Sequence, residues 1–405
     1  MKKLSFLILV SGILLNACTT TSTSTHDHYL VVLSLDGFRW DYANFSSTPV
    51  LDSIAAHGVK AERMIPSFPT TTFANHYTMA TGLYPDHHGI IHNYFYAPDL
   101  DAVFNEFGQR HTIEDRRFYG GEPIWVTAEK QGMKTATCFW VGSESDVQGI
   151  RPSYWKPYEH HMPYSDRIDT VMYWLQLPPE QRPKLIMWYI DEPDSKGHEW
   201  GPESDSIPEL ISQLDSLLGV FINRMNQLPH AKEINFMVVS DHGMAQLDKE
   251  RQLLLDHYID TSLINKFSGG NPVMSLQAKE GKADELIDQL NQVPHIHYWK
   301  HGELPAHLNF GTHERTLDFT VSASDGYSLF WSWRISNSKG AHGYDSSNPD
   351  MHTIFYAIGP DFKQGYAKKP FQNIHLYPLM AQLLSLQPAD TDGSIDSISD
   401  ILLSN

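Results

Sequence analysis

The chain has 405 residues and a formal net charge of −18, with 30 Lys and Arg against 48 Asp and Glu. This balance argues against the binding of nucleic-acid polymers, which needs a basic surface that displaces counterions, but it allows a small anionic substrate held by bound cations. The composition is that of a globular protein. The chain has only two cysteines, which excludes a disulfide scaffold or a thiolate metal site. It has 22 histidines, so metal sites with imidazole ligands are worth seeking.

The first segment is typical of an exported protein. Met1-Lys2-Lys3 is basic, and the apolar run from Leu4 to Leu15 is shorter than the roughly 20 residues that span a bilayer. The run ends in Leu15-Asn16-Ala17-Cys18, which resembles a bacterial lipoprotein signal. We therefore expect a signal peptide over residues 1–17, acylation of Cys18 and a polar tether over residues 18–28. The protein would then be anchored to the bacterial outer membrane, facing the periplasm. A plain secretory signal with an unrelated cysteine is the alternative.

Short apolar runs alternate with helical patterns along the rest of the chain. Runs without a polar face, too short for helices, predict strands buried on both faces at residues 29–34, 135–141, 185–190, 234–240 and 352–358. Helices are predicted at residues 48–57, 74–81, 123–131, 166–175, 283–290 and, most clearly, 210–228. This alternation predicts an α/β fold with a mostly parallel central sheet and helices on both faces.

The chain after the tether shows no obvious linker. Residues 29–390 are therefore predicted to form one main domain, followed by a C-terminal tail over residues 391–405. Residues 271–338 are rich in Trp, His and Gly and show no regular periodicity, which indicates a small insertion over the sheet edge. Cys138 lies within a predicted strand, where a thiol is expected to be buried and inert.

Three predicted strands run directly into acidic residues, and two of the segments that follow them also carry a histidine. The residues are Asp36, Asp194, His198, Asp241 and His242, and a further histidine, His342, lies in a glycine-rich segment. Any one of these acids alone would be an ordinary turn residue. Ligands of such sheets bind at the carboxyl ends of the strands, so these side chains are expected to face one crevice. Aspartate and imidazole together suit zinc and its first-row neighbours.

Three consecutive threonines, residues 70–72, precede the helix predicted at residues 74–81. A hydroxyl at a helix N-terminus lies close to free N–H groups and to the positive end of the dipole, which favour an alkoxide. One of these threonines is therefore a candidate nucleophile. The alternative is that a threonine only caps the helix.

Together these segments resemble the nucleotide pyrophosphatase/phosphodiesterase family of the alkaline phosphatase superfamily. The matching segments are residues 33–42, 66–93, 122–132, 192–202, 238–244 and 341–345. They occur in the family's order, and the resemblance runs from about residue 30 to residue 385. It implies that residues 29–390 are a phosphodiesterase catalytic domain in a bacterial lipoprotein member that lacks the disulfide-rich domains of the animal enzymes.

The resemblance also implies a set of site residues and two zinc ions. Asp36, Thr72, Asp241 and His242 would hold one ion, and Asp194, His198 and His342 the other. Thr72 would attack phosphorus and form a phosphothreonine intermediate. Asn93 would hydrogen-bond a phosphate oxygen, and Phe73 and Tyr158 would stack on a nucleobase. The implied activity is hydrolysis of nucleotide phosphodiester or pyrophosphate bonds, with release of nucleoside 5'-monophosphates.

Several alternatives stay open at this point. The main one is a lysophospholipid- or glycerophosphocholine-type phosphodiesterase of the same family, because an aromatic face also binds choline. A sulfatase is poorly supported because the segment from Thr71 to His76 lacks the required cysteine or serine and arginine. A monoesterase would usually hold phosphate with arginine where this chain has Asn93. A non-catalytic metal-binding lipoprotein is disfavoured because every implied ligand is present.

Overall fold

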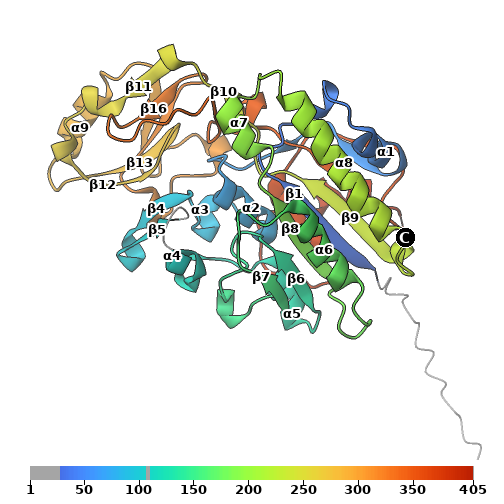
Figure 1. Ribbon diagram of the computed structural model, residues 1–405. Coiled ribbons are helices and arrows are strands. Elements are labelled where there is room, and N and C mark those ends of the chain that lie inside the picture. Colours follow the sequence, from blue (N-terminus) through green and yellow to red (C-terminus); the bar gives the residue numbers. More distant parts are fainter. Residues whose placement is uncertain (1–27, 106–109, 405) are drawn as a thin grey trace, which may run out of the picture.

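The computed structural model describes residues 28–105 and 110–404. Within this part of the chain, eight strands form the central sheet. Their order is β19 (Tyr366–Lys368), β2 (Val59–Ala61), β18 (Phe355–Ile358), β9 (Ile234–Val239), β1 (Tyr29–Leu35), β8 (Leu185–Ile190), β6 (Thr135–Cys138) and β7 (Tyr154–Lys156). Strands β1, β6, β7, β8 and β9 are labelled in Figure 1. Neighbouring strands are parallel except for β18, which is antiparallel to both of its neighbours. The predicted mostly parallel sheet is confirmed. The predicted signal peptide, Cys18 and tether residues 18–27 lie outside the described residues.

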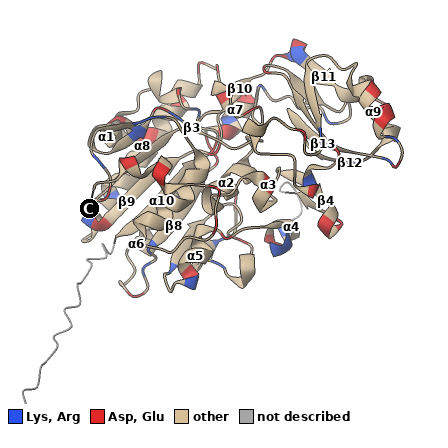
Figure 2. Cartoon of the chain, turned by 180° about the vertical axis from the view of Figure 1, so that it is seen from behind, with Lys and Arg blue, Asp and Glu red and all other residues tan. Residues whose placement is uncertain are grey.

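Helices cover both faces of the sheet, as predicted. One face carries α1 (Pro49–His57), α6 (Tyr164–Leu175) and α8 (Ile207–Met225), and the other carries α2 (Thr72–Thr81), α5 (Ile124–Lys130) and α10 (Leu376–Leu383) (Figures 1 and 2). The side chains of β1 alternate between the two faces: Leu30 and Val32 enter one hydrophobic core, and Val31 and Leu33 enter the other. Both faces of the strand are therefore buried, which explains its continuous apolar run.

Helix α2 begins two residues before the predicted start and so includes Thr72 and Phe73. It ends at Gly82, whose φ of +67° lets its N–H bond to the carbonyl of Thr78. The remaining described α-helices are α3 (Pro85–His88), α4 (Arg110–Glu114), α7 (Asp194–Trp200) and α9 (Ala283–Leu290). Only α9 was predicted from the sequence, and the other three are shorter than it.

The predicted insertion lies beyond the carboxyl ends of the parallel strands (Figure 1) and is more regular than its sequence indicates. It contains β11 (Gln252–Leu254), β12 (Ile264–Gly269), β13 (Val273–Ala278), β14 (Ile296–Lys300), β15 (Phe319–Ala323) and β16 (Ser328–Phe330). Four of these strands form an antiparallel sheet, and Leu253, Leu286 and Trp331 belong to its separate hydrophobic core. The insertion therefore begins before residue 271 and forms regular strands, although residues 271–338 show no regular periodicity. The strands β12 and β14 are only partly buried, which removes the continuous apolar pattern of a core strand.

Short two-stranded sheets connect the loops around the central sheet. They pair β3 (Met64–Ile65) with β20 (Phe371–Gln372), β4 (Tyr94–Ala97) with β5 (Ala102–Asn105), and β10 (Ala245–Gln246) with β17 (Gly340–Ala341). The last pair places His342 beside the loop that carries Asp241 and His242. Residues 391–404, set apart from the main domain in the sequence analysis, pack against it, and Ile398 and Ile401 are fully buried. Among the described helices, none combines the length and the apolar character needed to cross a bilayer.

Candidate active site

Three aspartates meet where adjacent strands of the sheet end. Strand β1 lies between β8 and β9, so Asp36 after β1 is flanked by Asp194 at the start of α7 and by Asp241 after β9. The backbones approach closely here, and the Asp194 N–H donates to the Asp36 carbonyl over 2.9 Å. Gly37 has a φ of +68°, and a Cβ on it would lie 2.8 Å from the Cβ of Asp194. Glycine is therefore required beside Asp36.

Three imidazoles face these carboxylates with a common orientation. The Nδ1–H groups donate to backbone carbonyls: His242 to Gly243 over 2.9 Å, His198 to Gly340 over 2.8 Å, and His342 to Thr70 over 2.9 Å. Because a carbonyl oxygen only accepts, each neutral ring carries its hydrogen on Nδ1 and presents the lone pair of Nε2 to the site. Metal-ligating histidines are held in this way.

The facing carboxylate oxygens are buried without a hydrogen-bond donor among the described residues. They are Asp36 Oδ1, Asp194 Oδ1 and Asp241 Oδ2. The Nε2 atom of His242 lies 3.3 Å from Asp36 Oδ1 and 3.1 Å from Asp241 Oδ2. Asp194 Oδ1 lies 3.4 Å from His198 Nε2 and 3.6 Å from His342 Nε2. The carboxylate oxygens and the Nε2 lone pairs are all acceptors, so they cannot hydrogen-bond to one another. Bound cations would satisfy them.

The electrostatics of the protein alone point in the same direction. Burial, with the nearby charges of Asp241 and Asp194, raises the pKa of Asp36 well above its ordinary value. Burial, with the nearby His242 and His198, lowers the pKa of His342 well below its ordinary value. A buried carboxylate whose negative charge is disfavoured by burial and by neighbouring carboxylates, as at Asp36, is stabilised by a bound cation. The donor set and its orientation therefore fit metal ions.

Two groups of these side chains have ligand atoms within 4.8 Å of one another. One group is Asp194, His198 and His342, which matches the predicted ligands of one ion. The other is Asp36, Asp194 and His242, so Asp194 is within reach of both groups. The assignment of each ligand to a particular ion stays a prediction.

Thr72 is the first residue of α2, and its Oγ1 lies 3.1 Å from His242 Nε2. Thr71 occupies the N-cap position, but its hydroxyl makes no hydrogen bond to the helix. The turn is fixed instead by the buried Asn75, whose amide NH₂ donates to the carbonyls of Ser67, Pro69 and Thr71. Neither Thr71 nor Thr72 therefore serves as a side-chain cap.

Asn93 lies next to Thr72. Its Oδ1 accepts the backbone N–H of Phe73 over 3.0 Å. This bond orients the amide, so its NH₂ is the end that can donate to a substrate. Asn93, Thr72 and Phe73 line one cavity of about 450 Å³ that also contacts Asp36, Asp194, His198 and His342.

Tyr158 lines the same cavity, so the structure brings both predicted base-stacking residues to one side of the site. The ring of Phe73 packs edge-on against Phe104, and the ring of Tyr158, which is 39% exposed, packs edge-on against Phe139. Asp241 and His242 are fully buried and do not line the cavity, but His242 contacts Thr72, which does. All predicted site residues among the described part of the chain thus line one cavity or lie directly beside it.

Two residues at the site were missed by sequence reasoning. The Tyr189 hydroxyl donates to Asp36 Oδ2 and leaves Oδ1 to face the imidazoles. The His76 Nδ1–H donates to the Thr72 carbonyl over 2.9 Å and lies 3.4 Å from Asp241 Oδ2. Tyr189 is hidden within the apolar run of β8. His76 follows Thr72 by one helical turn, and that spacing is a usable signal.

The arrangement defines a class of protein: a metal-dependent hydrolase with an alkaline phosphatase-like fold. Comparisons with known proteins give the family. Residues 30–345 match the type I phosphodiesterase/nucleotide pyrophosphatase family. The chain is 31% identical to mouse ectonucleotide pyrophosphatase/phosphodiesterase family member 7, over 96% of this chain and 90% of that protein. It is 35% identical to human family member 1, over 92% of this chain and 41% of that longer protein.

Solved structures are similar over nearly the whole chain. Murine ectonucleotide pyrophosphatase/phosphodiesterase 5 superimposes with a TM-score of 0.89 at 32% identity, covering 93% of this chain and all of that one. A second structure of that murine protein, an inactive threonine-to-alanine variant in complex with AMP, superimposes equally well. The chain therefore belongs to the type I phosphodiesterase/nucleotide pyrophosphatase family and is a hydrolase acting on phosphoric diester bonds.

Proposed function

We propose that this protein is a zinc-dependent nucleotide phosphodiesterase that works through a phosphothreonine on Thr72 and releases nucleoside 5'-monophosphates. The observation that carries the proposal is the position of the Thr72 hydroxyl, 3.1 Å from His242 Nε2 at the N-terminus of α2. An AMP complex of a relative that is inactive when a threonine is replaced by alanine supports both the nucleotide and the nucleophile.

Two zinc ions are proposed as the cofactors. Asp36, Thr72, Asp241 and His242 would hold one, and Asp194, His198 and His342 the other. Bound zinc would neutralise phosphate charge and favour the alkoxide of the nucleophile. Aspartate and imidazole are suitable zinc ligands, and the three imidazoles present their Nε2 lone pairs to the site, where that of His242 accepts the Thr72 hydroxyl.

The side chains of the protein perform the displacement in two steps. The Thr72 hydroxyl loses its proton to solvent, its oxygen attacks phosphorus, the bond to the leaving oxygen breaks, and the electron pair of that bond departs with the leaving group. The NH₂ of Asn93 donates to a non-bridging oxygen on which charge accumulates. Water then attacks the phosphothreonine, the bond between phosphorus and the Thr72 oxygen breaks, and a proton from the water restores the Thr72 hydroxyl, which gives the nucleoside 5'-monophosphate. The His76 bond to the Thr72 carbonyl fixes the first turn of α2 during both steps.

Tyr158→Ala is expected to raise KM for a nucleotide substrate by about 10-fold, because stacking of a base on an aromatic ring contributes about 1–3 kcal/mol. The same change should have little effect on bis(nitrophenyl) phosphate, which has no nucleobase. Steady-state kinetics on both substrates tests this expectation. Tyr173→Ala is the matched control, because Tyr173 is an exposed tyrosine of α6 that does not line the cavity. Equal KM changes on the two substrates would show that Tyr158 does not stack on a base.

The proposed function is tested with soluble protein that begins at Thr19. Hydrolysis of the nitrophenyl ester of thymidine 5'-monophosphate is compared with that of nitrophenyl phosphate, before and after chelation and after addition of zinc. The proposal predicts preference for the diester, loss of activity with chelator and recovery with zinc. Preference for the monoester, or undiminished activity without metal, would contradict it.

The domain boundaries and the location of the protein belong to the same proposal. Residues 29–390, with residues 391–404 packed against them, would form the catalytic domain, after a signal peptide over residues 1–17 and a tether attached through a lipid on Cys18 to the outer membrane. Periplasmic exposure would bring the site to nucleotides outside the cytoplasm. Labelling with a palmitate analogue, lost on Cys18→Ala, would support the anchor.

A further inference from the structure

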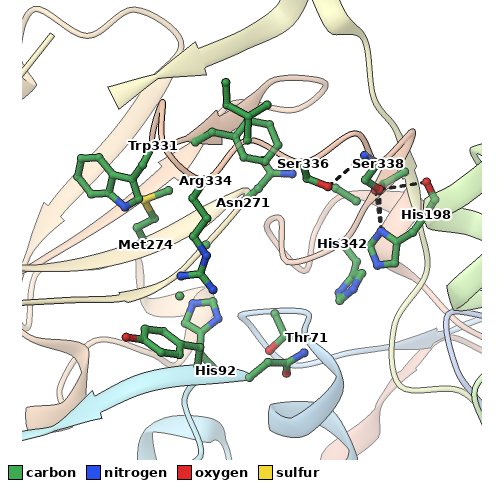
Figure 3. A pocket seen from close by; sticks show the side chains of 18 residues that line it. Thr71, His92, His198, Asn271, Met274, Trp331, Arg334, Ser336, Ser338 and His342 are labelled. Carbon is green, nitrogen blue, oxygen red and sulfur yellow. Dashed lines mark hydrogen bonds between the residues drawn. The ribbon is translucent and has the colours of Figure 1, made fainter. Parts of the chain in front are cut away.

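A second cavity borders the metal-ligand cluster. It also measures about 450 Å³ and is formed between the loops of the central sheet and the insertion (Figure 3). Asn93, His198 and His342 line both cavities, whereas Thr72 and Tyr158 line only the first. The insertion and the loop that follows it contribute Asn271, Met274, Trp331 and Arg334 to the second cavity. The proposed phosphate site therefore lies between two separate chambers.

The lining of the second cavity includes one arginine, Arg334, and no aspartate or glutamate. Arg334 makes no ion pair with any described carboxylate, and its guanidinium lies 5.1 Å from the centre of the Tyr94 ring. Figure 3 shows its side chain extending into the cavity towards His92. Arg334 is exposed, so its guanidinium is open to a ligand that enters from solvent. The guanidinium is suited to bind two oxygens of one phosphate.

Two buried polar atoms in the lining also lack partners. His92 is 4% exposed and its Nε2 makes no hydrogen bond, and Trp331 is 2% exposed and its Nε1–H finds no acceptor within the described residues. Each unsatisfied buried group costs about 1–3 kcal/mol. Both residues line the same cavity as Arg334.

We propose that this second cavity binds the leaving half of the diester, and that this half carries a phosphate held by Arg334. The inference rests on the proposed function, because an in-line displacement places the leaving oxygen opposite the attacking one. The nucleophile borders the first chamber, where the retained nucleotide binds against Tyr158. The leaving group then departs past His198 and His342 into the second chamber.

The charge of Arg334 selects the class of leaving group. In a nucleoside triphosphate or a dinucleotide joined by a pyrophosphate, the leaving oxygen belongs to a phosphate. When the bond between phosphorus and the bridging oxygen breaks, its electron pair stays on that phosphate, which leaves as an anion without needing a proton. The uncharged glyceride that a lysophospholipid would release gives Arg334 no partner. The geometry therefore favours pyrophosphate-linked substrates over lipid diesters.

The test compares two substrates that transfer the same thymidylyl group. Thymidine 5'-triphosphate has an anionic leaving group, and the nitrophenyl ester of thymidine 5'-monophosphate has a leaving group without phosphate. In Arg334→Gln, the ratio of kcat/KM for the triphosphate to kcat/KM for the ester is expected to fall about 10- to 100-fold. A fall of this size is typical when a hydrogen bond between two charged groups is lost. Arg334→Lys should give a smaller fall, because it retains the charge without the bidentate geometry.

Arg251→Gln is the matched control, because Arg251 is an exposed arginine of the same insertion region outside the cavity lining. Its ratio is expected to stay at the wild-type value. An unchanged ratio in Arg334→Gln, or an equal fall in Arg251→Gln, would overturn the inference and leave the proposed function intact. Failure of the wild-type protein to cleave the ester would overturn the proposed function itself.

Discussion

Thr72→Ala is expected to lower turnover of nucleotide diesters by on the order of 10⁴-fold or more, because removal of a nucleophile removes the covalent route. The hydroxyl is the reacting group in the proposed mechanism, and α2 begins at this residue without using it as a cap. Zinc content should stay close to that of the wild type, since six other side chains are proposed to bind the ions. Steady-state rates and metal analysis of the same preparation test both parts.

Thr72→Ser is the matched control for this change. Serine keeps the hydroxyl and lacks only the methyl group, so measurable turnover should return. The account would be contradicted by wild-type turnover in Thr72→Ala. It would also be contradicted if Thr72→Ser were as inactive as the alanine variant while binding metal normally, because the hydroxyl would then be insufficient for the chemistry.

His198→Ala is expected to lower zinc content from about two ions to about one per chain, and activity by at least about 100-fold. His198 is held by the Gly340 carbonyl and presents Nε2 to Asp194, in the group with His342. It is partly exposed, so its removal leaves a smaller packing defect than the removal of the buried His342. Metal analysis after dialysis measures the stoichiometry.

His57→Ala provides the control for histidine removal in general. His57 lies on the exposed side of α1, where its ring bonds only to the Ser53 carbonyl, and its loss should change neither zinc content nor rate. Two zinc ions and full activity in His198→Ala would remove this residue from the ligand set. Zinc loss of the same size in His57→Ala would show that the measurement reports general destabilisation.

The sequence contains most of the information that places the site. Strands such as β1 and β8 are buried on both faces, and that burial produces continuous apolar runs that are easily recognised. Because adjacent parallel strands end at the same side of a sheet, the acids that follow these runs were expected to meet, and Asp36, Asp194 and Asp241 do so. The antiparallel direction of β18 was not predictable from its apolar pattern, because such a pattern is the same in both directions.

The parts that sequence reasoning missed depend on contacts between distant segments. Two of the insertion strands, β12 and β14, are only partly buried, and β12 contains a register shift between Ile264 and Lys266, so their pattern does not resemble that of core strands. Arg334 and His92 lie more than two hundred residues apart and belong to no shared motif. Only the folding of the insertion against the sheet brings them to one cavity. Tyr189 was missed because its hydroxyl function is hidden in an apolar strand.

The central claim is that hydrolysis passes through a covalent bond between Thr72 and phosphorus. The stereochemical course of the reaction tests it most directly, with a nucleoside phosphorothioate diester of known configuration as substrate and isotopically labelled water as the acceptor. Two successive in-line displacements each invert phosphorus, so the account predicts net retention of configuration. Net inversion would show that water attacks the diester directly and would contradict the role of Thr72 as nucleophile.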